Sequence, residues 1–298
     1  MEPDRNRDPE AFSLYGEPLF RAPLRPERKE KQEEAYREAL AEYRSDPTNV
    51  ENIIWLGRRT AYLGHHREAN GIFSYGIAIH PKETRLYRHR GHRFITIRRF
   101  DLAQADFEKA AQLIDGKDDN PESDGETNPE DISISSLHFN IWYHLGLTYY
   151  LQGKFERALY AYKRCMDSSY NNDRLVATSH WLYMTLQRLG RVDEAKQVLE
   201  AITEEMDIVE NQFYHEALLM YKGLKSVDEL LEKAQSQGVL GMITSGYGLG
   251  CWYLYNGDND KAREVYQNIL DTDSWGAFGY IAAEADLYRL DAKPFPME

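Results

Sequence analysis

The feature of this sequence that most constrains its fold is a set of small and aromatic residues that recurs about every 34 residues. An alanine in similar surroundings recurs at Ala69, Ala103, Ala158, Ala195 and Ala262. A glycine lies five residues before each of them except Ala103, where Arg98 stands, and twelve residues before each except Ala195, where Tyr183 stands. An aromatic side chain or a leucine follows each alanine four residues later, and Leu230 marks a degenerate sixth unit. A helical bundle without repeats is the alternative, but three classes of anchor residue coincide over five units, which favours the repeat.

The spacing has a mechanism. A glycine flanked by two apolar-periodic segments of about 12 residues predicts a helix, a turn and a second helix. Small residues on both helices mark a close crossing, where a bulky side chain would cost about 1–3 kcal/mol. The aromatic residue shares the helix face of the alanine, and we expect it to fill the space towards the next unit. The sequence therefore predicts an all-α array of helix pairs.

Two stretches of the pattern resemble the tetratricopeptide repeat (TPR) consensus. One begins at Trp142 and contains Gly146, Gly153, Ala158 and Tyr162. The second contains Gly57, Gly64, Ala69, Phe73 and Pro81. The resemblance covers about residues 50–276 and implies a right-handed α-solenoid of about six TPR-like helix–turn–helix repeats with capping helices. The family is defined by packing residues and not by a reaction, so the resemblance implies far more about fold than about function.

Segments of different composition flank the array. Residues 1–26 contain Pro18, Pro23 and Pro26, which favours an extended N-terminal arm. We expect the arm to pack on the outer surface; the alternative is that it lies in the groove of its own protein as an internal ligand. Residues 27–49 predict an N-terminal capping helix, and residues 277–298 a C-terminal capping helix and tail.

Charge is unevenly spread along a chain whose net charge is −13. Residues 50–114 hold eleven Lys and Arg against six Asp and Glu, a net +5, whereas residues 115–136 hold one against eight, a net −7. The acidic stretch coincides with 21 extra residues between Ala103 and Ala158 and predicts a mobile loop inserted in the array. The alternative is that this loop masks the basic stretch at 85–99. The acidity of the whole chain argues against non-specific nucleic-acid binding.

Little in the sequence indicates catalysis or a metal. His89 and His92 lie three residues apart on a predicted helix, but Arg88, Arg90 and Arg93 surround them, and cations disfavour a bound divalent metal. No Gly-x-Ser-x-Gly motif is present, and Cys165 falls at a repeat position that is normally buried. We expect no enzyme activity, no catalytic or metal-binding residues and no cofactor.

The resemblance implies a binding surface, because the first helix of each repeat lines the concave groove in this family. Carried onto this sequence, the inner positions are Arg58, Tyr62, Arg85, Arg88, His92, Tyr143, Tyr150, His180, Met184 and Tyr247, with Leu147, His215 and Tyr255 beside them. Arginines and aromatic residues dominate binding hot spots, and arginine binds carboxylates through two hydrogen bonds. The implied groove has a cationic floor in its N-terminal part and an aromatic floor in its C-terminal part. It suits an extended peptide with an acidic or C-terminal carboxylate end.

We therefore expect a protein–protein interaction scaffold that binds a peptide or protein segment in the concave TPR groove. The alternative is binding of a small anionic ligand or nucleic acid by the basic stretch Arg85–Arg99. No signal peptide and no apolar run of transmembrane length is visible, which predicts a cytoplasmic protein without a membrane span. A cell-envelope location is equally compatible if a signal peptide was removed. The sequence identifies neither the partner nor the oligomeric state.

Overall fold

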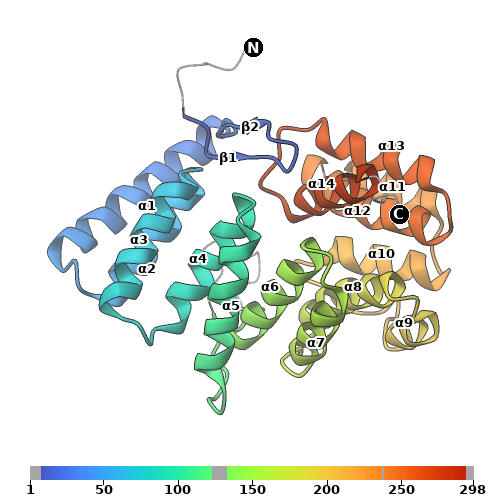
Figure 1. Ribbon diagram of the computed structural model, residues 1–298, viewed down its shortest axis with the longest axis horizontal. Helices are drawn as coiled ribbons and strands as arrows, with labels where there is room; N and C mark the ends of the chain where they lie inside the picture. The colour runs from blue at the N-terminus through green and yellow to red at the C-terminus, as the bar shows by residue number, and fades with distance from the viewer. Residues whose placement is uncertain (1–7, 123–132, 237, 293–298) are drawn as a thin grey trace, which may run out of the picture. The chain divides into compact units, whose positions relative to one another are not determined.

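The computed structural model describes residues 8–122, 133–236 and 238–292 (Figure 1). The chain divides into two compact units, residues 1–117 and residues 118–298. The boundary between them lies inside the predicted insertion 115–136.

In its described residues, the N-terminal unit contains a short hairpin and five helices. In chain order these are β1 (Ala11–Phe12), β2 (Pro18–Leu19), α1 (Pro26–Ser45), α2 (Val50–Tyr62), α3 (His66–Ile79), α4 (Thr84–Thr96) and α5 (Phe100–Ile114). Each helix packs on the next, so α2 with α3 and α4 with α5 form two helix pairs. The first helix, α1, packs on α2 and leaves most of its own side chains exposed to solvent.

The described part of the N-terminal arm contains a short hairpin. β1 and β2 pair antiparallel, with Ala11 opposite Leu19. The arm contacts the turn between α2 and α3: a guanidinium nitrogen of Arg21 lies 2.7 Å from His65 Nε2, and the backbone N–H of Arg67 donates to Glu10 at 3.2 Å. Residues 1–7 lie outside the described residues.

The C-terminal unit contains nine helices in the described residues. They are α6 (Leu137–Leu151), α7 (Phe155–Met166), α8 (Asn172–Arg188), α9 (Val192–Val198), α10 (Gln212–Lys222), α11 (Val227–Ser236), α12 (Gly238–Tyr255), α13 (Asn259–Leu270) and α14 (Phe278–Asp291). Eight of them form four consecutive pairs, including α10 and α11 at the degenerate unit, where Leu230 is fully buried. With the two pairs of the N-terminal unit this makes six pairs, and the predicted all-α repeat fold is confirmed. The last helix, α14, packs on α12, α13 and α6.

The repeating glycines and aromatic residues meet inside each pair. A Cβ atom added at Gly57 would lie 2.4 Å from the ring of Phe73, and one at Gly146 would lie 2.6 Å from the ring of Tyr162. Gly91 with Phe107 and Gly250 with Tyr266 repeat this contact. Each ring therefore lies on the glycine of its own pair, where the missing side chain leaves room for it. The expected contact with the next unit is also present at Phe73, whose ring stacks on His89 of α4 with centroids 5.7 Å apart.

The turn between paired helices needs a left-handed backbone. Gly64, Gly153, Gly190 and Gly257 all have φ between +70° and +84° there. Arg98 occupies the equivalent place with φ +62°, the only non-glycine residue with positive φ among the described residues. Such a conformation costs a residue with a side chain about 1–2 kcal/mol. The buried Arg98 guanidinium offsets part of this cost by donating to the carbonyl of Thr96 at 2.6 Å.

The two ends of the predicted insertion contact the C-terminal unit through hydrogen bonds. Glu122 is 6% exposed and accepts a hydrogen bond from Asn140 Nδ2 at 2.7 Å. Asp119 accepts hydrogen bonds from the Ser136 hydroxyl at 2.6 Å and from the backbone N–H of His138 at 2.9 Å, which secures the start of α6. The expected mobility and masking role concern mainly residues 123–132, which lie outside the described residues.

None of the helices in the described ranges combines the length and the apolar character that a membrane crossing requires.

Candidate functional site

Arginines and aromatic side chains from α2 and α4 meet on one face of the N-terminal unit, which we call the arginine face (Trp55, Arg58, Tyr62, Arg88 and Arg93). The Arg58 guanidinium lies 4.5 Å from the centroid of the Trp55 ring and donates to the Tyr62 hydroxyl at 3.2 Å. Arg58 and Arg88 are only 7% and 8% exposed, whereas Trp55, Tyr62 and Arg93 are half-buried, so the solvent-accessible part of this face comes mainly from the latter three.

The electrostatics of this face come from cations gathered at close range. Burial, opposed by Tyr62 and reinforced by Arg88 and Arg58, lowers the pKa of Arg93 to about 10. Burial and the same two arginines hold the pKa of His89 well below its ordinary value, so this imidazole is neutral at pH 7. An anion bound here would stabilise the charged form of every one of these guanidinium groups.

Two further predicted residues of this unit have different surroundings. Arg85 forms ion pairs with Glu51 at 2.6 Å and Glu83 at 2.8 Å, and chiefly the hydrogen bond to Glu83 raises its pKa against the effect of burial. Its charge is therefore largely engaged by the chain itself. His92 lies one turn after Arg88 and is half-buried.

The five predicted residues of the C-terminal unit lie in its core. Tyr143, Tyr150, His180, Met184 and Tyr247 are between 0% and 7% exposed. The first helices of the four pairs converge there: the Tyr150 and Tyr247 hydroxyls are 3.1 Å apart, and the Trp181 indole N–H donates to the Tyr143 hydroxyl at 2.7 Å. The structure thus brings these residues together, but as packed side chains and not as the floor of an open groove. Their contact with a partner stays a prediction.

The same core contains a buried charged cluster that no sequence pattern predicts. The Asp286 carboxylate of α14 pairs with Arg188 of α8 and with Arg289, and accepts a hydrogen bond from the Tyr247 hydroxyl at 3.0 Å. Burial acts to lower the pKa of Arg188, but Asp286 raises it well above its ordinary value. Arg289 also donates to the carbonyl of Leu151 in α6 at 2.8 Å. The cluster therefore ties the last helix of the unit to two helices near its start, a contact without any sequence signal because it joins residues about 100 positions apart.

Thiol and metal chemistry have no visible centre in the described parts of the chain. Burial raises the pKa of the Cys165 thiol to about 12 and also raises the pKa of Cys251, so both thiols are protonated at pH 7. Across residues 8–122, 133–236 and 238–292, no three His, Cys, Asp or Glu side chains are grouped as metal ligands would be.

Two of the helix pairs match family models. Residues 139–172, which contain α6 and α7, match a model described as tetratricopeptide repeat, and residues 244–273, which contain most of α12 and α13, match a second model of the same description. Together with the six helix pairs, these matches support a tetratricopeptide-repeat protein. Arrays of such repeats present extended surfaces to protein partners, so the family supports a protein-interaction scaffold.

Solved structures show only distant likeness. The MamA protein is 16% identical with a TM-score of 0.45, over 67% of this chain and 88% of that one. YrrB, described as a TPR protein with an unusual peptide-binding site, is 14% identical with a TM-score of 0.43, over 84% of this chain and 97% of its own. A putative kinesin light chain of Podosopora anserina with TPR-like repeats is 16% identical with a TM-score of 0.44, over 82% and 98%. No curated protein matches the chain.

Proposed function

We propose that this protein is a non-enzymatic scaffold that binds an acidic segment of a protein partner on the arginine face of its N-terminal unit. The observation that carries the proposal is the Arg58 guanidinium packed on Trp55 and bonded to Tyr62, in a cluster with Arg88 and Arg93. Burial first, and then the charges of Arg88 and Arg58, lower the pKa of Arg93. Carboxylates of a partner would relieve this repulsion and form bidentate hydrogen bonds with the guanidinium groups.

The neighbouring aromatic rings favour a peptide over a small anion. Trp55 and Tyr62 lie beside Arg58 and Arg59. The guanidinium carbon of Arg58 is 4.5 Å from the centroid of the Trp55 ring, and that of Arg59 is 5.0 Å from it. Tryptophan, tyrosine and arginine are the residues most enriched in interface hot spots, because they offer large contact areas with few rotatable bonds. Tyr62, Arg88 and His92 of the predicted groove belong to this proposal, whereas Arg85 contributes less because Glu51 and Glu83 already pair with it.

The test compares two variants of equal charge. In the first, Arg58→Gln and Arg88→Gln remove two charges from the arginine face while keeping side chains that form hydrogen bonds. The control, Arg37→Gln with Arg44→Gln, removes two exposed charges from α1 of the same unit. Binding of a fluorescent dodecapeptide rich in Asp and Glu is measured by anisotropy, after circular dichroism shows that both variants are folded.

We expect the first variant to bind the acidic peptide at least about tenfold more weakly, whereas the control binds like the native chain. Equal binding by all three proteins would refute the proposal. A single-stranded oligonucleotide that binds more tightly than the peptide, with an affinity that falls steeply with salt, would instead support the nucleic-acid alternative.

A further inference from the structure

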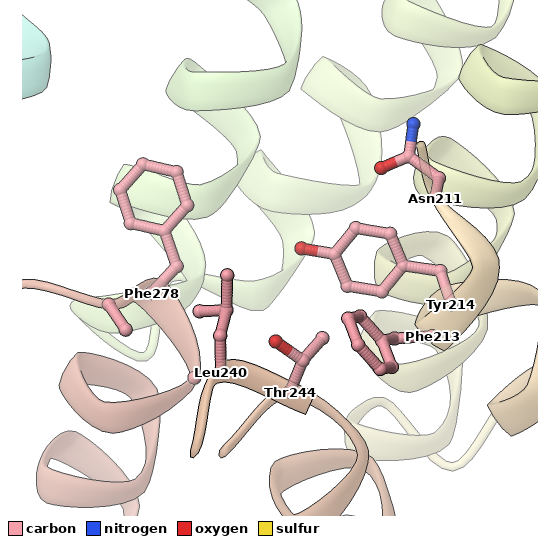
Figure 2. Close-up of a pocket in the computed structure, with 8 residues that line it drawn as sticks. Asn211, Phe213, Tyr214, Leu240, Thr244 and Phe278 are labelled. Atoms are coloured by element: carbon pink, nitrogen blue, oxygen red, sulfur yellow. The ribbon is translucent and has the colours of Figure 1, made fainter. Parts of the chain in front are cut away.

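The C-terminal unit has an apolar pocket of about 190 Å³ where the starts of α10, α12 and α14 meet. Figure 2 shows the rings of Phe213, Tyr214 and Phe278 around it, with Leu240 and Thr244 of α12 beside them. Asn211 and Thr244 add polar side chains to a lining that is otherwise mostly apolar. None of these residues belongs to the arginine face or to the predicted groove.

The walls of this pocket are held in place by the rest of the unit. A Cβ atom at Gly241 would lie 2.7 Å from the Phe213 ring, so α10 and α12 approach closely there. The Tyr214 hydroxyl lies 3.1 Å from the hydroxyl of Tyr143 in α6, and the Phe278 ring packs edge-on against His144 at 5.5 Å.

The rim at the start of α10 is equally fixed. The carboxylate of Asp173, which is 3% exposed, accepts backbone hydrogen bonds from residues 209, 210 and 211 at 2.8–2.9 Å. A pocket whose walls and rim are set before binding loses little conformational entropy when it is filled.

One wall of the pocket is itself exposed to solvent. Leu240 of α12 lines the pocket and is 60% exposed, and Val239, which precedes it, is 57% exposed. An apolar pocket with an exposed apolar wall is typical of a docking site. Its volume suits one ring or one branched aliphatic side chain, because an apolar cavity of about 150 Å³ accommodates benzene.

The charged residues near the pocket indicate which residues of a partner would flank the side chain that it holds. Within four positions of the residues that line the pocket, the sequence contains Asp207, Glu210, Glu216 and Asp273 and no Lys or Arg. Lys222 stands at the other end of α10, and Glu216 already pairs with Lys225. The charged residues closest to the lining in the sequence are therefore acidic, and acidic side chains attract cations.

We propose that this pocket is a second docking site, which takes one aromatic or leucine side chain of a protein partner whose adjacent residues are Lys or Arg. The site is independent of the arginine face: it lies in the other unit, and it prefers a partner segment of opposite charge. The two units thus recognise two kinds of segment, one basic with an apolar anchor and one acidic.

The experiment selects peptides from a phage-displayed library of random dodecapeptides on the full chain and remeasures the selected peptides in solution. We expect sequences with a Phe, Trp or Leu flanked by Lys or Arg. Leu240→Asp and Thr244→Phe should each weaken binding at least about tenfold, the first by removing an apolar wall and the second by filling the pocket. Because Leu240→Asp adds a negative charge beside a basic peptide, loss of binding in this variant cannot arise from charge repulsion.

Val192→Asp is the matched control, since Val192 is 44% exposed on α9 of the same unit. It should leave binding unchanged, and circular dichroism should show all three variants folded. The proposal is overturned if the selected peptides bind Leu240→Asp and the native chain equally, or if no basic apolar peptide is selected. It is also overturned if only a free small molecule such as indole fills the pocket. Selection of acidic peptides alone, with binding lost in Arg58→Gln/Arg88→Gln, would support the arginine face and refute this second site.

Discussion

Single atoms decide the packing inside each helix pair of this protein. The glycines of the first helices receive the rings of the second helices, and a Cβ atom at Gly57, Gly146 or Gly250 would lie 2.4–2.6 Å from a ring carbon. Where Tyr183 replaces the glycine, the partner position holds Leu199 in place of a ring, and Tyr183 stacks on Tyr221 with centroids 4.5 Å apart. In this pair the large side chain of the first helix therefore packs on α10.

This geometry predicts the effect of adding volume at one glycine. Gly146→Leu should lower the free energy of unfolding by about 1–3 kcal/mol or more, because the Tyr162 ring must move. Urea unfolding followed by circular dichroism measures the change. Gly71→Ala is the control: nothing lies within 4 Å of its Cβ position in α3, so it should raise stability by about 0.4–1 kcal/mol. Equal stability of Gly146→Leu and the native chain would contradict the packing described here.

The helix α14 packs against α6, α12 and α13 of the C-terminal unit, and its Asp286 carboxylate forms buried ion pairs there. Asp286 is 1% exposed and faces Arg188 and Arg289. Removing one partner from a buried ionic cluster leaves uncompensated charge, which is strongly destabilising. The helix is therefore part of the core of the unit and not a removable cap.

Asp286→Asn should lower the free energy of unfolding by about 3–5 kcal/mol. The comparison is Asp291→Asn, which removes the partly exposed ion pair with Arg263 at 2.5 Å and should cost less than about 1 kcal/mol. Chemical denaturation of both variants checks the difference. Similar losses in the two would mean that the buried cluster contributes little.

The insertion between α5 and α6 can be shortened as a test of its contribution to the fold. Replacing residues 123–132 by a short Gly-Ser linker should leave the far-ultraviolet circular dichroism nearly unchanged, because Asp119 and Glu122 keep their contacts. Glu122→Ala, in contrast, removes the acceptor of a buried amide and should cost about 1–3 kcal/mol. A large loss of helicity in the linker variant would show that the replaced residues stabilise the fold.

At the scale of the whole molecule, buried neutral histidines couple stability to pH. Burial, followed by the charges of Arg93, His65 and Arg98, lowers the pKa of His66 to about 3, and burial lowers that of His180 to about 3. The pKa of His89 is also well below its ordinary value. The unfolded chain binds protons at these residues near pH 6.5, whereas the folded chain does not. The contribution of these histidines to the free energy of unfolding is therefore fully present above pH 6.5. It is lost as the pH drops from about 6.5 towards 3.

The expected slope is up to about 1.4 kcal/mol per pH unit for each such histidine. Urea unfolding at pH 7, 6 and 5 measures it, and His180→Gln should reduce the slope by up to one histidine's share. A free energy of unfolding that stays constant over this range would contradict the buried neutral state.

The glycine, alanine and aromatic spacing is enough to predict the helix pairs, their order and their number, because it is a local requirement of two helices that cross closely. The same pattern places Arg58, Tyr62, Arg88 and His92 on the first helices of the N-terminal unit. The burial of the predicted residues follows from tertiary packing, and Arg58 and Arg88 are themselves only 7% and 8% exposed. Tyr143, Tyr150, His180, Met184 and Tyr247 are buried because the first helices of the C-terminal unit converge and α14 packs against them. That convergence, the Asp286 cluster and the apolar pocket join residues far apart in the chain, and no local spacing encodes contacts of that range.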